Sequence, residues 1–354
     1  MKRKFIPFTQ VKNQKAIIVD SLHPNGLVLS HWRGAPTPAA VRGDTSADIV
    51  LNALKTPAVN LEWEYVTANH FDIDGFVGVW ALLQPDLALA YEPVLRQMAL
   101  IGDFRELNLD NPAADLALKL VCWINAREKE FFYPPFGAGE TEESEVMASV
   151  PKFKYFLREF AQVLRHPEKE KEIWGPEYAT VTHGYQVIRG QKNKIKTYPG
   201  IGLVVVQTPE PVHYYALFSP TSGFDMVLAQ YGTNRYELEC KYTTWVDIAS
   251  RPTLPRVALA PLASILNQQE TASQRWTAEP IIDTGPILRL AGQNLTKQER
   301  YANPTERPIY SSGLTPAYLE KTVVEYFTEA YREVTPQQNW TWEEVKAWNK
   351  RSYN

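Results

Sequence analysis

The stretch YVTANHFDIDGFVGVWALL, residues 65–83, passes from an apolar strand pattern through a polar segment to an apolar helix pattern. Its first four residues predict a short buried strand, and residues 75–83 predict the helix that follows. Residues 15–20 predict a short, fully buried strand, residues 27–31 predict a second strand, and residues 47–54 predict another helix. Strands that alternate with helices indicate an α/β fold with a doubly wound parallel sheet and right-handed crossovers.

The length of the chain predicts two domains, because 354 residues are more than one hydrophobic core usually serves. Residues 1–125 predict an α/β metal-binding domain, residues 126–177 a helical insertion or linker with a solvated charged face, and residues 178–354 a β-rich α+β domain with C-terminal helices. In the last domain, strands are predicted at 202–207, 213–218, 226–230 and 236–244, and helices at 257–266 and 317–334.

The composition is that of an ordinary globular protein, with 44% hydrophobic and 22% charged residues. A formal net charge of −3 without a long basic run argues against a broad nucleic-acid surface. We find neither a signal-peptide core nor an apolar run long enough to cross a bilayer, so we expect a cytoplasmic protein without a membrane partner. Cys122 and Cys240 alone cannot build a disulfide framework, which fits a reducing compartment. The sequence leaves a homo-oligomer open.

Three candidate metal ligands, His70, Asp72 and Asp74, alternate in the polar segment. At strand spacing, residues i, i+2 and i+4 share one face, so the three side chains could converge on one point. Two carboxylates and an imidazole suit Mn²⁺, Mg²⁺ or Fe²⁺ better than a structural zinc ion. The competing interpretation is a turn with a helix N-cap, which explains one Asp but explains three aligned ligands poorly.

Further polar residues follow the other predicted strands. Asp20 ends the first strand, His31 ends the second, and Asn69 follows the third. In doubly wound sheets, ligands bind beyond the carboxyl ends of the strands. We therefore expect these residues at the same edge of the sheet as residues 70–74.

The pattern His-x-Asp-x-Asp-Gly after an apolar strand resembles the first motif of the DHH phosphoesterases. These two-metal hydrolases include exonucleases, oligoribonucleases, cyclic-dinucleotide phosphodiesterases and inorganic pyrophosphatases. The segment AIIVD, residues 16–20, is similar to the family's second motif, a strand that ends in a metal-bridging Asp. LVLSHW, residues 27–32, is similar to the strand with the namesake Asp-His-His, of which His31 is retained. ALIGDF, residues 99–104, resembles the fourth motif and implies Asp103 as a further ligand.

This resemblance implies metal-dependent hydrolysis of a phosphate ester or anhydride, with one or two Mn²⁺ or Mg²⁺ ions. The expected substrate is a small phosphorylated molecule or a short nucleotide. His31 is expected either to support a metal ligand from outside the coordination sphere or to act as a proton donor, with Asp72 as the second catalytic residue. The implied ligands are Asp20, His70, Asp72, Asp74 and Asp103, and the expected substrate-binding residues are Arg33, Asn69 and Arg251, whose planar guanidinium suits an anion.

Two departures from the family pattern leave alternatives open. The motifs occur in a different order, which requires a circularly permuted sheet. A permuted sheet predicts that the strand ending at Asp20 lies directly beside the strand ending at Asn69. Ser30 and Trp32 also replace an Asp and a His, so the alternative is a one-metal site or a degenerate protein that binds a ligand or partner without turnover.

Two other resemblances bear on this assignment. The sequence FDIDG also resembles the opening of haloacid-dehalogenase-type phosphatases, with Asp72 as nucleophile and Asp74 as acid/base. In that family an apolar stretch leads into the first Asp, whereas here the more polar TANH, residues 67–70, precedes FDIDG, so we favour the metal site. The whole chain also resembles an uncharacterised bacterial protein family that shares the Ser-His-Trp and Asn-His-Phe-Asp segments.

Overall fold

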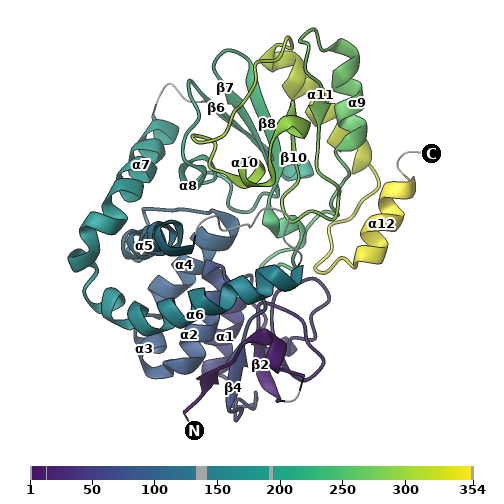
Figure 1. The fold of residues 1–354 in the computed structure, drawn as a ribbon. Coiled ribbons are helices and arrows are strands. Elements are labelled where there is room, and N and C mark those ends of the chain that lie inside the picture. The colour runs from purple at the N-terminus through teal and green to yellow at the C-terminus, as the bar shows by residue number, and fades with distance from the viewer. Residues whose placement is uncertain (1, 13, 133–141, 191–193, 352–354) are drawn as a thin grey trace. The chain divides into compact units, whose positions relative to one another are not determined.

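The computed structural model describes residues 2–12, 14–132, 142–190 and 194–351 (Figure 1). Its contacts divide the chain into two compact units. The first comprises Met1–Ala179 together with Ile248–Ser250, and the second comprises Thr180–Asp247 and Arg251–Asn354. The described parts of the helical segment predicted at 126–177, which are residues 126–132 and 142–177, therefore lie within the first unit, and its residues 133–141 lie outside the described residues.

The first unit contains a four-stranded sheet in the order β1-β4-β2-β3, in which all neighbours are parallel. Ala16 pairs with Tyr65 and Ile18 with Thr67, so the strands that precede Asp20 and Asn69 are neighbours, as the permuted order predicts. The predicted α/β class with a parallel sheet is confirmed. The strands are β1 (Lys4–Phe5), β2 (Ala16–Val19), β3 (Gly26–Leu29) and β4 (Tyr65–Thr67).

Strand β2 is buried on both faces, as its uninterrupted apolar sequence predicts. Side chains alternate between the two faces of a strand. Ala16 and Ile18 belong to a core formed with Ile6, Val11 and Val28, whereas Val19 faces a helix of the opposite layer. Helices α1 (Ser46–Leu54) and α2 (Ile73–Leu83) form that layer and pack on each other (Figure 1).

The other long elements described in the first unit are helices. Helix α4 packs against α1, α2 and α5, and α5 also contacts α6. The helices are α3 (Pro85–Ala90), α4 (Glu92–Phe104), α5 (Ala114–Phe132), α6 (Glu142–Arg165) and α7 (Lys171–Arg189), of which α7 continues into the second unit. The 3-10 turns among the described residues of both units are η1 (Phe8–Gln10), η2 (Ala39–Val41), η3 (Pro167–Glu170), η4 (Pro199–Ile201), η5 (Tyr242–Thr244) and η6 (Gly292–Asn294).

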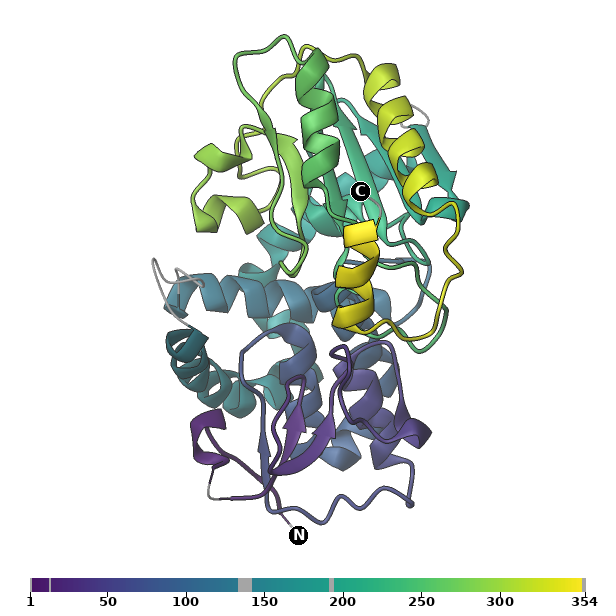
Figure 2. The same cartoon turned by 90° about the vertical axis from the view of Figure 1, so that its right-hand side faces the viewer.

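The second unit contains a six-stranded mixed sheet in the order β5-β6-β7-β8-β10-β9, in which only β6 and β7 are parallel neighbours. Helices α9 (Ala260–Gln269) and α11 (Pro316–Ala330) lie together over one face, as Figure 2 shows in green and yellow. The strands are β5 (Lys194–Tyr198), β6 (Leu203–Thr208), β7 (Met226–Tyr231), β8 (Arg235–Cys240), β9 (Trp276–Thr277) and β10 (Ile287–Leu290); the other helices are α8 (Tyr214–Leu217), α10 (Lys297–Tyr301) and α12 (Trp342–Arg351).

The strand predicted at 213–218 is wrong, because the segment forms the short helix α8. His213 Nδ1 accepts a hydrogen bond from the Tyr215 N–H and so caps the first turn. A buried apolar run of this length does not distinguish a helical turn from a strand. The strand predicted at 236–244 also ends early, at Cys240, and the 3-10 turn η5 follows it.

Within the part of the chain that the structure describes, no helix is both long enough and apolar enough to cross a membrane. Cys122 and Cys240 are free and buried, one in each unit. Burial raises the pKa of both thiols, which disfavours the reactive thiolate.

Gly78 allows helix α2 to approach strand β2 closely. A Cβ atom added at Gly78 would lie 2.6 Å from Val19 Cγ1, which is shorter than any normal carbon–carbon contact. Val19 immediately precedes Asp20, and Gly78 lies one helical turn after Asp74. This contact therefore sets the spacing between two of the candidate ligands.

We predict that Gly78→Ala destabilises the first unit by about 1–3 kcal/mol, the usual penalty for overpacking a core. Calorimetric unfolding should show a lower midpoint for the variant. Gly200→Ala is the matched control, because a Cβ atom at Gly200 meets nothing within 4 Å. Equal midpoints for the two variants would contradict a tight contact between α2 and β2.

Candidate metal centre

The predicted ligands come together at the carboxyl ends of β2, β3 and β4. Asp20 directly follows β2, and His31 lies two residues beyond the end of β3. Asp20 has a φ of 47°, in the left-handed region that residues other than glycine seldom occupy. Strain of this kind often occurs at functional sites. The backbone of Asp20 therefore turns sharply at the edge where the ligands meet.

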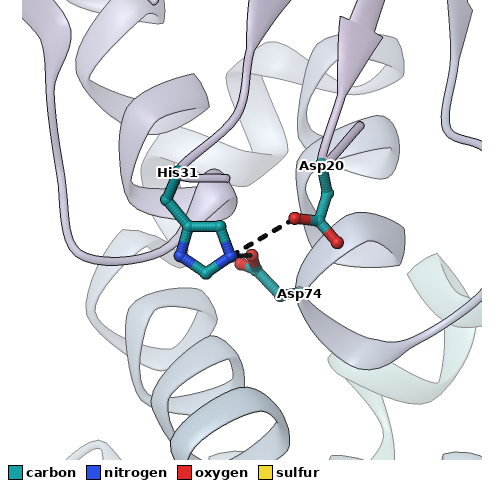
Figure 3. Close-up of side chains that lie close together, drawn as sticks. All are labelled: Asp20, His31 and Asp74. Carbon is teal, nitrogen blue, oxygen red and sulfur yellow. Dashed lines mark ion pairs between the residues drawn. The ribbon is translucent and has the colours of Figure 1, made fainter. Parts of the chain in front are cut away.

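The Asp20 carboxylate lies between two histidines. Its Oδ1 is 3.3 Å from His31 Nε2, and its Oδ2 is 3.4 Å from His70 Nε2. Two sets of ligand atoms result, each lying within 4.8 Å of one another: the buried set of Asp20, His31 and Asp74, and the open set of Asp20, His70 and Asp72. Figure 3 shows the buried set. The two sets have one residue in common, Asp20.

The two sets differ in exposure to solvent. The side chains of His31 and Asp74 are 0% exposed, whereas those of His70 and Asp72 are each 34% exposed. Only the open set is therefore accessible to a molecule from solution.

Asp72 and Asp74 belong to different sets, so the expectation that they share one strand face with His70 is wrong. The chain leaves its extended conformation here because the Asp72 Oδ1 atom accepts a hydrogen bond from the Gly75 N–H at 2.8 Å and caps α2. Asp74 lies in the first turn of that helix. Both the N-cap interpretation and the clustering of ligands therefore apply to this segment.

The N-terminus of α1 holds the buried carboxylates. Asp74 accepts hydrogen bonds from the backbone N–H groups of Ser46 and Ala47, both at 2.8 Å. The Ser46 hydroxyl donates to Asp20 Oδ1 at 2.8 Å. Unpaired N–H groups and the helix dipole at this end favour negative charge. Ser46 is a site residue that the sequence analysis missed, since only a helix-start signal marks it.

Both histidines are oriented through their Nδ1 atoms. His31 Nδ1–H donates to the backbone carbonyl of Asp44 at 2.6 Å, and His70 Nδ1 lies 2.7 Å from Asn69 Oδ1. This leaves each Nε2 atom directed at carboxylates, the arrangement found for metal-binding imidazoles. Asn69, predicted to bind substrate, therefore positions His70 in this structure.

Asp103, on α4, lies beside the buried set. Its Oδ2 atom is 3.6 Å from His31 Nε2 and accepts no hydrogen bond from the described residues, although the side chain is only 5% exposed. The two arginines predicted to bind substrate lie in different units. Arg33 is a buried residue near the end of β3, in the first unit. Arg251 lies in the second unit, where its guanidinium binds Asp225 through contacts of 2.5 and 3.0 Å.

Helix α6 holds the loop that carries His70 and Asp72. The Phe71 N–H donates to Ser149 Oγ at 2.9 Å. The Phe71 ring stacks on Phe156, with ring centroids 4.9 Å apart, and meets Phe153 edge-on. The segment predicted as an insertion or linker thus contributes to the position of the open set.

The clustered carboxylates perturb one another strongly. Burial and the neighbouring Asp20 carboxylate raise the pKa of Asp74 to about 7, and burial raises the pKa of Asp103 well above its usual range. Burial alone would lower the pKa of His70, but the carboxylates of Asp72 and Asp20 outweigh it and raise that pKa to about 9. Carboxylates outnumber imidazoles, so the centre has too little positive charge of its own.

The fold and these residues define an α/β protein with a candidate centre for divalent cations. The chain belongs to a protein family of unknown function, DUF6687, whose model matches residues 1–338. No curated protein and no solved structure matches the chain. The family match covers most of both units and provides no link to the DHH phosphoesterases.

We predict that the metal-free protein is less stable at pH 8 than at pH 6. A group whose pKa is higher in the folded protein than in the unfolded chain stabilises the fold while it is protonated. This contribution is complete below the pKa of the unfolded chain, and it is lost as the pH rises through the pKa of the folded protein. For Asp74 the loss extends to about pH 7 and for His70 to about pH 9. Urea unfolding in EDTA at pH 6, 7 and 8 should show a falling free energy of unfolding.

Asp103→Asn supplies the matching variant, because the amide imitates the protonated acid and cannot titrate. This variant should show a shallower dependence on pH and higher stability at pH 8. Asp86→Asn, at an exposed position in the first turn of α3, should keep the wild-type slope. A wild-type stability that rises from pH 6 to pH 8 would contradict this account of the charges.

Proposed function

We propose that this centre binds Mn²⁺ or Mg²⁺ and that the protein hydrolyses a phosphate ester or anhydride of a small phosphorylated molecule or short nucleotide. The observation that carries the proposal is the position of Asp20, whose two oxygens face two separate histidine–aspartate sets. The resemblance of residues 16–20 and 70–75 to DHH phosphoesterase motifs supports the same class of reaction.

The donor atoms fit a divalent cation. Carboxylate oxygens with imidazole nitrogens suit Mn²⁺, and an oxygen-rich set also accepts Mg²⁺. The buried Asp103 Oδ2 atom, which accepts no hydrogen bond from the described residues, offers a further oxygen. The raised pKa values of Asp74 and Asp103 indicate carboxylates that a cation would stabilise in the ionised form.

The exposure of the open set indicates where a substrate would arrive. A phosphate group could reach His70 and Asp72, whereas His31 is buried with Nε2 among carboxylates. We therefore assign His31 as a ligand of the buried set in place of the expected proton donor. A divalent ion polarises a phosphate ester and makes water a better nucleophile at neutral pH. Asn69 would keep the His70 ring in the orientation that this contact needs.

The first prediction from this proposal concerns stoichiometry. Wild-type protein should bind two Mn²⁺ ions, Asp72→Asn should bind one, and Asp20→Asn should bind none tightly, because Asp20 belongs to both sets. Isothermal titration gives the number of ions. Thermal midpoints should rise with Mn²⁺ only in the proteins that bind it.

Asp86→Asn is the control for a general effect of lost charge and should bind as wild type does. Wild-type protein without any Mn²⁺ binding would overturn the proposal. If wild type and Asp72→Asn each bind only one ion, the open set does not bind metal, and that part of the proposal is wrong.

The second prediction concerns turnover. Wild-type protein with Mn²⁺ should hydrolyse at least one of p-nitrophenyl phosphate, bis-p-nitrophenyl phosphate and pyrophosphate, which represent a monoester, a diester and an anhydride. Asp72→Ala should reduce the rate by roughly 100-fold or more, since loss of even an outer-sphere partner of a metal can cost that much. Tight Mn²⁺ binding without hydrolysis of any probe would favour a degenerate, ligand-binding member of the same fold.

A further inference from the structure

A short segment from late in the sequence binds the residue that holds His31. Residues Ile248–Ser250 belong to the first unit, although the chain on both sides of them belongs to the second. Asp44 Oδ1 accepts hydrogen bonds from the N–H groups of Ala249 at 2.9 Å and Ser250 at 2.8 Å. The Ser250 hydroxyl donates to Asp44 Oδ2 at 2.6 Å. One carboxylate therefore accepts three hydrogen bonds from two consecutive residues.

The backbone of Asp44 faces the metal centre. Its carbonyl oxygen accepts the hydrogen bond from His31 Nδ1–H at 2.6 Å, which leaves Nε2 directed at Asp20 and Asp74. Asp44 is also two residues before Ser46, whose N–H and hydroxyl groups bind Asp74 and Asp20. A displacement of the Asp44 peptide would therefore move the histidine and the groups that hold both carboxylates.

The side-chain contact fixes this peptide. A carboxylate that accepts hydrogen bonds through both of its oxygens is held in a defined orientation. Asp44 lies before the first turn of α1 and outside the regular helix, so the helix alone does not fix its carbonyl. The hydrogen bonds from Ala249 and Ser250 restrain Asp44 through its side chain, whereas its backbone carbonyl contacts His31.

We propose that docking of residues 248–250 on the Asp44 side chain positions His31 and thereby sets the affinity of the buried set for a divalent ion. Asp44 and Ser250 are positioning residues, because neither contacts the ligand sites directly through its side chain. By linkage, an ion in the buried set strengthens the docking of the segment by the same factor. This inference rests on the proposed function, since it concerns the ion-binding form of the same centre.

The test uses full-length protein in the Asp72→Asn background, where the buried set alone is expected to bind. Mn²⁺ affinity is measured by titration calorimetry, and the environment of the bound ion by electron paramagnetic resonance. Asp44→Ala should weaken Mn²⁺ binding roughly tenfold, as expected when an outer partner of a metal-binding histidine is lost. It should also change the zero-field splitting of the Mn²⁺ spectrum.

Two further variants separate positioning from a general loss of stability. Asp44→Asn keeps an oxygen for the two backbone N–H groups and should recover most of the affinity. Ser250→Ala removes one of the three hydrogen bonds and should weaken binding less than Asp44→Ala. Ser264→Ala is the matched control, because this exposed serine donates only to the Ala260 carbonyl of its own helix.

Amide hydrogen exchange at residues 249 and 250 provides a readout of docking that is independent of activity. Exchange should be faster in Asp44→Ala, and Mn²⁺ should slow it in the protein that retains Asp44. Faster exchange in Asp44→Ala with unchanged Mn²⁺ affinity would overturn the positioning role and leave the proposed function intact. If Asp44→Ala does not fold, hydrogen exchange and Mn²⁺ affinity are compared in Ser250→Ala instead. If the wild-type protein binds no Mn²⁺, the proposed function and this inference both fall.

Discussion

The Asp20 carboxylate faces His31 with one oxygen and His70 with the other, and the remaining contacts of the centre are arranged around it. That position depends on the parallel pairing of β2 with β3 and β4, which brings three strand ends to one edge. It depends also on the left-handed backbone of Asp20. The polar residues at the edge therefore meet because three parallel strands, of which the central β2 is buried throughout, end side by side there.

Burial of so many acids requires compensation from the fold. The N-terminus of α1 provides N–H groups to Asp74 and a hydroxyl to Asp20, and the imidazoles of His31 and His70 lie beside the two oxygens of Asp20. Backbone donors are suited to this purpose, because they remain in place whether or not a cation is bound. The compensation is incomplete at Asp103, whose buried Oδ2 atom accepts no hydrogen bond from the described residues, and burial raises the pKa of Asp74 and of Asp103.

The sequence was informative where the signal was local. Uninterrupted apolar runs predicted β2, β3 and β4, and the polar residues after each run predicted the edge at which the candidate ligands meet. The predicted strand spacing of His70, Asp72 and Asp74 was wrong, because Asp72 caps a helix that starts at Ile73, so that Asp74 lies in the helix and His70 before it. The local sequence did not distinguish an extended segment with three aligned ligands from a turn followed by a helix N-cap.

Other features of the site depend on contacts between distant residues and could not be predicted. Ser46 meets Asp20 from 26 positions away, and Ser250 meets Asp44 from 206 positions away. Sequence periodicity reports the faces of single helices and strands, so it does not predict either of these long-range contacts. The helix at 214–217 was missed for a related reason, since its burial and the cap from His213 outweigh the β propensity of its tyrosines.

The different exposure of the two sets has a consequence for the kinetics of ion exchange. An ion in the buried set would be enclosed by side chains of which His31 and Asp74 are 0% exposed, whereas an ion beside His70 and Asp72 would border on water. The inner ion could leave only after the surrounding structure opens, and opening of a packed site is slow compared with ligand exchange in water. A brief treatment with chelator would therefore remove one class of ion and retain the other. The metal content of the purified protein would therefore depend on its exposure to chelators during purification as well as on its equilibrium affinities.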